Sequence, residues 1–142
     1  MRALFDLNVL ISLFDTQHVH YMKAHHWWAQ NRSPGWASCP FTQNGFLRIL
    51  SQPSYKFPVP LSKAFRDLRE VTERDDHAFW PDDISLLDER VINRERVLGP
   101  KQLTDIYLLA LAVKHEGRLV TFDRSIPIAA IRGAKPHHVV VI

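Results

Sequence analysis

The chain has almost no cysteine, no long hydrophobic run and no strong excess of charge of either sign. Its single cysteine, Cys39, rules out an internal disulfide framework and a zinc site built from several thiolates. No stretch approaches the roughly 18 apolar residues that a membrane-spanning helix needs. An aspartate at position 6 interrupts the first apolar run too early for a signal peptide. These absences favour a protein of the reducing cytoplasm without a membrane segment.

What remains is the composition of one ordinary globular domain. The chain has 142 residues, of which 46% are hydrophobic and 23% are charged. Eighteen basic and fifteen acidic residues give a net charge of +3. That mild excess is compatible with a nucleic-acid substrate, although it is common in other proteins too. There are no repeats, low-complexity tracts or linkers, so we expect a single domain over residues 1–142.

Short apolar segments alternate with amphipathic ones along the chain. Strands are predicted at residues 3–5, 35–39, 77–81, 118–123 and 138–142. Helices are predicted directly after the first strand and at residues 18–32, 42–50, 61–74, 84–97 and 104–117. Thr42 and Thr104 are expected to cap two of these helices, and the proline-rich stretch 51–60 is expected to be a loop. This alternation predicts an α/β domain whose parallel sheet is covered on both faces.

Three aspartates stand at the ends of these elements. Asp6 directly follows the first strand, Asp123 ends the strand at 118–123, and Asp105 lies in the first turn of a strongly apolar helix. Ligands of open α/β sheets bind beyond the carboxyl ends of the strands, so the three carboxylates are expected to meet there, with Asn8 beside them. Oxygen ligands without cysteine select hard cations such as Mg²⁺ or Mn²⁺. A metal held there could activate a water and stabilise charge on a phosphodiester, which is nuclease chemistry.

Each aspartate also has an ordinary structural explanation. Asp6 could cap a helix, Asp105 could complement a helix dipole, and Asp123 could belong to a turn. Taken singly, these explanations compete with a ligand role. The joint placement of all three at strand and helix ends favours the metal site.

The segments FDLNVLISLFD, CPFTQNGFLRIL and LTDIYLLALAVKHEGRLVTFD, in this order, resemble the PIN-domain ribonucleases of the VapC type, which are toxins of bacterial toxin–antitoxin pairs. The resemblance implies a compact three-layer α/β/α sandwich with a central parallel sheet of about five strands. It also implies Mg²⁺- or Mn²⁺-dependent cleavage of RNA, inhibition by a small cognate antitoxin, and a homodimer. By position, Asp6, Asp105 and Asp123 match the acidic residues that hold metal in the family, and Thr121 matches a polar residue that supports them.

One position departs from the pattern of that family. The family carries a glutamate in the motif T-E-N-G-F-x-R, where this chain has Gln43 in TQNGFLRIL. An amide oxygen can accept a hydrogen bond from water or bind a cation weakly, but it brings no charge. We therefore expect Gln43 to remain part of the catalytic site with weaker metal binding. Two other functions stay open: a catalytically weakened PIN domain that acts mainly as an RNA- or antitoxin-binding module, and a phosphatase of small phosphate esters.

The other polar segments have simpler interpretations. The four histidines between positions 18 and 26 do not place three imidazoles on one helix face, so a solvated helix face is favoured over a zinc site. Cys39, in the segment WASCP, is interpreted as a small buried side chain rather than a nucleophile. The pairs Asp75–Asp76 and Asp82–Asp83 are interpreted as solvated turn residues. Candidates for contacts with phosphate are Arg48, Lys56, Arg66 and Arg124.

Overall fold

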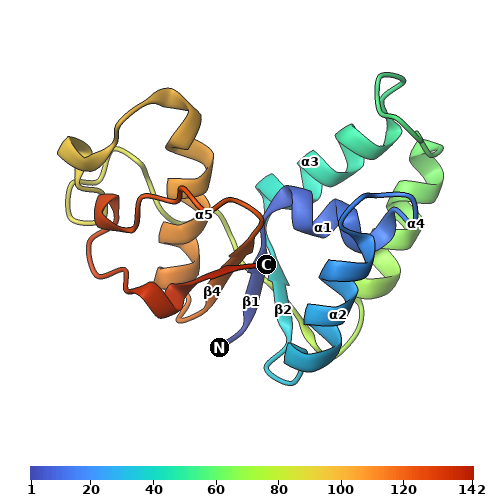
Figure 1. Cartoon of the computed structure of the whole chain (residues 1–142), viewed down its shortest axis with the longest axis horizontal. Helices are drawn as coiled ribbons and strands as arrows, with labels where there is room; N and C mark the ends of the chain where they lie inside the picture. Colours follow the sequence, from blue (N-terminus) through green and yellow to red (C-terminus); the bar gives the residue numbers. More distant parts are fainter.

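The computed structural model describes all residues from 1 to 142 and contains one five-stranded sheet (Figure 1). The strands run parallel in the order β3-β2-β1-β4-β5. Their bounds are β1 Ala3–Phe5, β2 Trp36–Ser38, β3 His77–Phe79, β4 Arg118–Thr121 and β5 Val139–Val141. Each observed strand lies inside one of the five predicted ones, so the predicted parallel sheet is confirmed.

Five helices cover the two faces of the sheet. Their bounds are α1 Leu7–Phe14, α2 Tyr21–Asn31, α3 Pro40–Ser51, α4 Leu61–Thr72 and α5 Leu103–Lys114. Helix α5 lies on one face, whereas α1 to α4 lie on the other (Figure 1). This is the predicted three-layer α/β/α arrangement. No helix is both long enough and apolar enough to span a bilayer.

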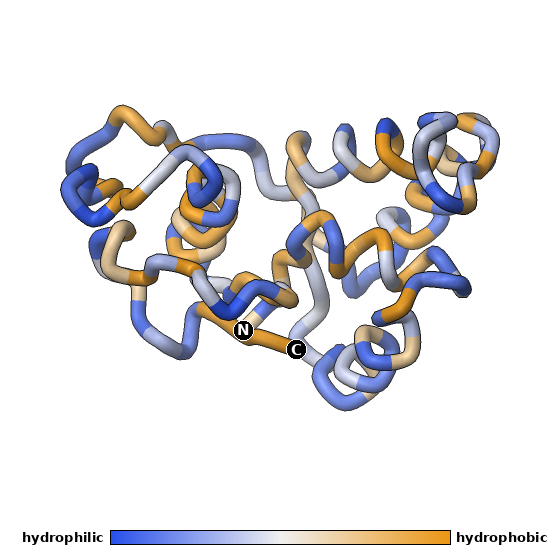
Figure 2. Tube along the Cα trace, turned by 45° about the horizontal axis from the view of Figure 1, so that its top comes forward, coloured by the Kyte–Doolittle hydropathy of each residue, from blue (hydrophilic) through white to orange (hydrophobic).

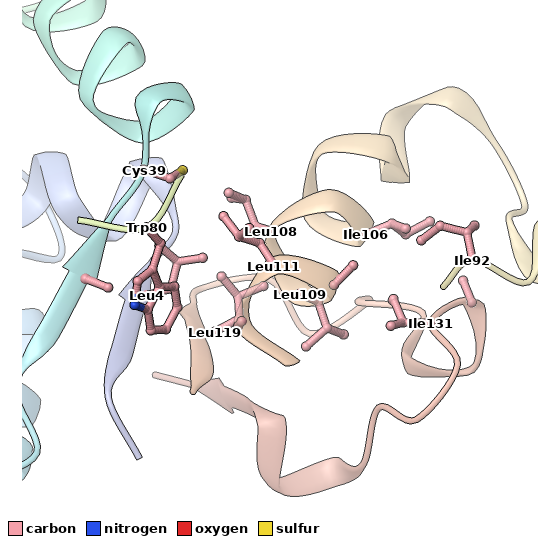
Figure 3. Packing of buried hydrophobic residues seen from close by; sticks show 14 residues of the cluster. Leu4, Cys39, Trp80, Ile92, Ile106, Leu108, Leu109, Leu111, Leu119 and Ile131 are labelled. Atoms are coloured by element: carbon pink, nitrogen blue, oxygen red, sulfur yellow. The ribbon is translucent and has the colours of Figure 1, made fainter. Parts of the chain in front are cut away.

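The central strands are continuously apolar because both of their faces are buried. In β1, Leu4 points into the core cluster around α5, while Ala3 and Phe5 point into a second cluster on the opposite face. In β4, Leu119 and Val120 divide in the same way, since successive strand side chains face opposite sides. Figure 3 shows Leu4 and Leu119 meeting the apolar side chains of α5. Figure 2 shows that the hydrophilic segments gather on the outer turns.

The order of the strands reverses at β1. From β1 the chain builds β2 and β3 on one side, and then returns to place β4 on the other side, with Phe5 paired to Val120. A reversal of this kind leaves a crevice beyond the carboxyl ends of the neighbouring strands, where α/β proteins bind ligands. Asp6 follows β1 and Asp123 follows β4, so the fold brings both to this crevice.

The predicted caps Thr42 and Thr104 are wrong. Helix α3 begins two residues before Thr42, at Pro40, because proline is favoured at the first helical position. Thr42 instead lies inside the first turn, where its Oγ1 accepts a hydrogen bond from the backbone N–H of Cys39 at 3.1 Å. Helix α5 begins at Leu103, directly after a 3₁₀ turn, so Thr104 is already helical. Asp105 remains in the first turn of α5, as predicted.

The helix predicted at 84–97 is also wrong. This stretch consists of turns, one 3₁₀ turn at Arg94–Arg96, and an isolated antiparallel bridge between Ile92 and Ile131. Two short polar side chains bond to nearby backbone instead: Ser85 Oγ accepts from the N–H of Leu87, and Asp88 Oδ1 accepts from that of Arg90. Such local bonds compete with a helix. Most apolar residues of the stretch pack separately against the α5 cluster, whereas Leu87 is exposed.

Candidate active site

A cavity of about 500 Å³ opens at the carboxyl ends of β1 and β4. It receives side chains from the start of α1, the start of α3, the start of α5 and the segment after β4. All three aspartates predicted to form the site line it, as does Asn8. The complete lining is Asp6, Leu7, Asn8, Phe41, Thr104, Asp105, Phe122 and Asp123.

Asp6 is the most buried of the three aspartates, with only 9% of its surface exposed. It stands at the N-cap position of α1, where the backbone N–H groups of Leu7 and Asn8 act to lower its pKa, so capping accounts for part of its placement. Burial raises the pKa of Asp6, and a hydrogen bond from Thr121 partly opposes that rise. The Oγ1 of Thr121 donates to Asp6 Oδ2 at 3.0 Å, in a fully buried position.

Thr121 connects two of the aspartates. Besides donating to Asp6, its Oγ1 accepts a hydrogen bond from the backbone N–H of Asp123 at 3.0 Å. Asp123 Oδ1 accepts from the backbone N–H and the hydroxyl of Ser125, at 2.7 and 2.6 Å, and these bonds lower the pKa of the carboxyl group. The turn interpretation of Asp123 is therefore right for one oxygen. The other oxygen, Oδ2, has no hydrogen-bond partner within the protein.

Asp105 completes the acidic lining from the other side of the cavity. Its carboxylate is half-buried and forms no hydrogen bond or ion pair with any other residue. Burial, together with the negative charges of Asp6 and Asp123, raises the pKa of Asp105 to about 6. The three carboxylates are thus close enough to affect one another, although they come from distant parts of the chain.

The donor set of this cavity fits a hard divalent cation. No lysine, arginine or histidine lines it, and none of its aspartates forms an ion pair. Clustered carboxylates of this kind need a positive charge. Nowhere in the chain do three Asp, Glu, His or Cys side chains lie close enough to enclose one ion. Mg²⁺ is usually held by one or two carboxylates and retains several waters, so an open acidic site suits it.

In a second cavity, about 540 Å³ in volume, the carboxylates are paired with cationic side chains. It is lined by residues of α5 and of the turns at 83–91. Asp83 pairs with Lys114 at 3.3 Å, and Asp88 pairs with Arg90 at 2.9 Å. Because each carboxylate already has a cation, this cavity offers no comparable site for a metal.

Gln43 does not line the acidic cavity. Its Nε2 donates to the buried Ser38 Oγ at 3.0 Å, and Ser38 Oγ is 2.8 Å from His77 Nε2. His77 also hydrogen bonds to the backbone of Thr72, and burial lowers its pKa. Because Gln43 donates to Ser38, the Ser38 hydroxyl is free to donate to a neutral His77. The structure therefore does not bring Gln43 to the three aspartates.

Sequence reasoning missed two aromatic residues of the cavity, Phe41 and Phe122. Neither was considered as a site residue, although each stands next to a residue that ends a strand or begins a helix. That position at the carboxyl edge of the sheet was the available signal. None of the cations considered for phosphate contacts lines the cavity; Arg124 follows Asp123 directly and is exposed.

Comparison with known proteins agrees with this architecture. Residues 3–132 match the model of the PIN domain, and the chain therefore belongs to the PIN-domain family. It is 48% identical to "Ribonuclease VapC44" of Mycobacterium tuberculosis over 142 residues, which is the full length of both chains. That similarity makes it a PIN protein of the VapC type.

Two solved structures share the fold. The toxin VapC20 of M. tuberculosis, described as cleaving the sarcin–ricin loop, superposes with a TM-score of 0.62. The match covers 94% of this chain and 99% of the other, at 13% identity. VapBC2 from Rickettsia felis, bound to a DNA fragment from its promoter, superposes with a TM-score of 0.57 at 12% identity, covering 89% and 94%.

Proposed function

We propose that the chain is a divalent-metal-dependent endoribonuclease and the toxin of a toxin–antitoxin pair. One observation carries the proposal: three carboxylates from distant parts of the chain line a single cavity that contains no cationic side chain. Membership of the PIN family and the similarity to a VapC ribonuclease support the choice of RNA as the substrate.

In this proposal Asp6, Asp105 and Asp123 hold Mg²⁺ or Mn²⁺, partly through waters. The bound metal supplies an activated water and offsets charge on the phosphodiester. Thr121 acts behind the ligands, since it fixes an oxygen of Asp6 and the backbone of Asp123 with one hydroxyl. Asn8, exposed at the cavity wall, offers an amide that can orient a water.

The proposed partners are an RNA substrate, a cognate antitoxin and a second copy of the chain, and the proposed compartment is the cytoplasm. The antitoxin is supported by the full-length similarity to the VapC group. It is also supported by the fold shared with VapBC2.

The direct test is Asp105→Asn, with RNA cleavage measured during titration with Mg²⁺ or Mn²⁺. We expect cleavage to fall by more than about 100-fold, because even partners behind the metal ligands cost 10- to 100-fold when removed. The matched control is Asp75→Asn, which removes one exposed carboxylate outside the cavity. If Asp105→Asn cleaved RNA as fast as the parent, the site would be wrongly assigned. Small phosphate esters are assayed in parallel. Cleavage of RNA without hydrolysis of any such ester would exclude a phosphatase.

A second candidate is a catalytically weakened PIN domain that serves as an RNA- or antitoxin-binding module. The neutral Gln43 and its engagement with Ser38 favour this candidate. A parent chain that binds RNA but does not cleave it at any Mg²⁺ or Mn²⁺ concentration would support the second candidate over the first.

A further inference from the structure

Two phenylalanines share the cavity with the three aspartates. Phe41 is 39% exposed and lines this cavity with its apolar ring. Phe122 is half-buried and lines the same cavity. The mechanism proposed above uses neither ring, so their place beside the three carboxylates needs a separate explanation.

The topology places the two phenylalanines on segments to either side of the one that carries Asp6. Phe41 follows β2, Asp6 follows β1 and Phe122 follows β4, and these strands are neighbours in the order β2-β1-β4. Neighbouring strands lie about 4.8 Å apart, so the ends of β2 and β4 are separated by roughly 10 Å. The segments that carry the two phenylalanines therefore lie on either side of the segment that carries Asp6, and both phenylalanines line the acidic cavity.

Other aromatic side chains hold both rings in place. The ring of Phe41 lies 6.4 Å from that of Tyr107, whose hydroxyl donates to Asp82. The ring of Phe122 lies 4.4 Å from the imidazole of His20, at an interplanar angle of 35°. His18 stacks against Phe122 at 6.4 Å and 18°.

These contacts also change the interpretation of two histidines. His18 and His20 were expected to lie on a solvated helix face, but α2 begins only at Tyr21. Both imidazoles are half-buried and pack against Phe122 at the edge of the acidic cavity.

We propose that Phe41 and Phe122 stack on the two nucleobases that flank the scissile phosphate of an unpaired RNA segment. This inference rests on the proposed function, because it takes the acidic cavity as the place of the phosphate. Every base offers a π-face to an aromatic ring, so such stacking tolerates many sequences. A paired and stacked duplex does not present those faces, and RNA-binding proteins take splayed bases from loops and single strands.

The test compares two end-labelled probes of equal length: a short oligouridylate, and an oligomer with the same ribose-phosphate backbone but without bases. Binding is measured by fluorescence anisotropy with Ca²⁺ as the cation, and electrophoresis verifies that the probes stay intact. We expect Phe41→Ala to weaken binding of the oligouridylate by roughly 5- to 150-fold. Binding of the abasic probe should not change, and Phe41→Trp should restore binding of the oligouridylate.

Phe122→Leu extends the test while it keeps an apolar side chain against the core. It should weaken only the binding that depends on bases. Phe57→Ala is the matched control, because Phe57 is 38% exposed, as Phe41 is, but lies outside the cavity. Thermal melting of each variant shows whether it folds.

Three results would overturn the stacking proposal: no change with Phe41→Ala, an equal loss for both probes, or failure of Phe41→Trp to restore binding. The first would also be expected if Phe41 contacted a protein partner instead. The proposed function is tested separately by cleavage. If the parent chain cut no RNA with Mg²⁺ or Mn²⁺, the proposed endoribonuclease activity would be wrong. Binding that depends on bases and on Phe41 would still support the stacking proposal.

Discussion

Two polar corners at the carboxyl edge of the sheet differ in their charge balance. Between β1 and β4, the acidic corner gathers Asp6, Asp105 and Asp123 without a cation. Across β2 and β3, the neutral corner joins Ser38, Gln43 and His77 in a hydrogen-bonded chain that carries no carboxylate. Asp6 and Asp123 follow the carboxyl ends of β1 and β4, whereas Ser38 ends β2 and His77 begins β3. Neighbouring strands therefore present polar groups in both places, and the side chains decide which of the two is acidic.

The difference shows that Gln43 belongs to the neutral corner. From the sequence, Gln43 was expected to lie in the catalytic site beside the three aspartates, as a neutral replacement for the glutamate of the family. In the structure its amide donates to a buried hydroxyl, which a carboxylate could not do. Charge is retained only at the corner where an external cation would compensate it, because unpaired buried charge is costly.

Among variants that keep all three carboxylates, the largest effect is expected from breaking the link inside the acidic corner with Thr121→Val. This change keeps the shape of the buried side chain but removes the hydroxyl that holds Asp6 and Asp123. We expect metal affinity and RNA cleavage to fall by about 10- to 100-fold, as for other residues that orient metal ligands. Calorimetric titration with Mn²⁺ and initial cleavage rates measure this.

The control for that prediction is Thr72→Val on α4, whose hydroxyl bonds only to the carbonyl of Arg69. It should leave metal affinity unchanged. Equal losses in both variants would mean that Thr121 contributes to folding rather than to the orientation of the ligands.

A smaller effect is expected in the pH dependence of stability. The pKa of Asp105 is raised from 3.8 to about 6 in the folded state, so the folded chain binds its proton more tightly than the unfolded chain. The free energy of unfolding of the metal-free protein should therefore fall as pH rises from about 4 to about 6, and stay low above that. Asp105→Asn should remove this loss and melt roughly 2–5 °C higher than the parent at neutral pH.

Differential scanning calorimetry of the parent, Asp105→Asn and Asp75→Asn measures that effect, and the difference between proteins cancels other titrating groups. Mg²⁺ should reduce the difference in melting temperature between Asp105→Asn and the parent, because it stabilises the parent. A difference in melting temperature that stayed the same at pH 4 and pH 7 would show that neither burial nor the neighbouring carboxylates raise the pKa of Asp105.

The smallest effect on cleavage is expected from Gln43→Glu in the neutral corner. Glutamate cannot donate to Ser38, so the Ser38 hydroxyl would have to turn its proton away from His77. We expect the free energy of unfolding to fall by about 1–3 kcal/mol, because the hydrogen bond between Ser38 and His77 is lost. RNA cleavage should stay within about threefold, which is less than 1 kcal/mol. Denaturant unfolding and cleavage rates measure the two quantities.

Asn44→Asp makes the same change of charge at the next, exposed position of α3 and is the matched control. If Gln43→Glu raised metal affinity far more than Asn44→Asp, then position 43 would reach the acidic corner after all. The weakened-site interpretation of this chain would gain support accordingly.

The sequence predicted most of the fold because the buried strands and α5 are apolar throughout. It also predicted that Asp6, Asp105, Asp123 and Asn8 would meet, since parallel strands end at one edge. Their roles in catalysis stay predictions. What failed was local: Pro40 started α3 before Thr42, and short polar side chains broke the expected helix at 84–97.

The direction of a side chain could not be read from the sequence where its partners are distant. Gln43, on helix α3, donates to Ser38 of β2, and Ser38 in turn contacts His77 of β3. Phe41 was not considered as a site residue, and only the tertiary fold brings it to the cavity that Asp6 lines. Such contacts depend on tertiary pairing rather than on periodicity along the chain.

The strand order also suggests how the protein could be divided as a split enzyme. Asp6 and Phe41 precede the exposed turn at Arg94–Arg96, whereas Asp105 and Asp123 follow it. A cut in that turn would give two fragments, neither of which carries all three carboxylates. RNA cleavage would then require the two fragments to reassemble. The pairing of β1 with β4, beside which the cavity lies, would thus make the chain a candidate for fragment complementation.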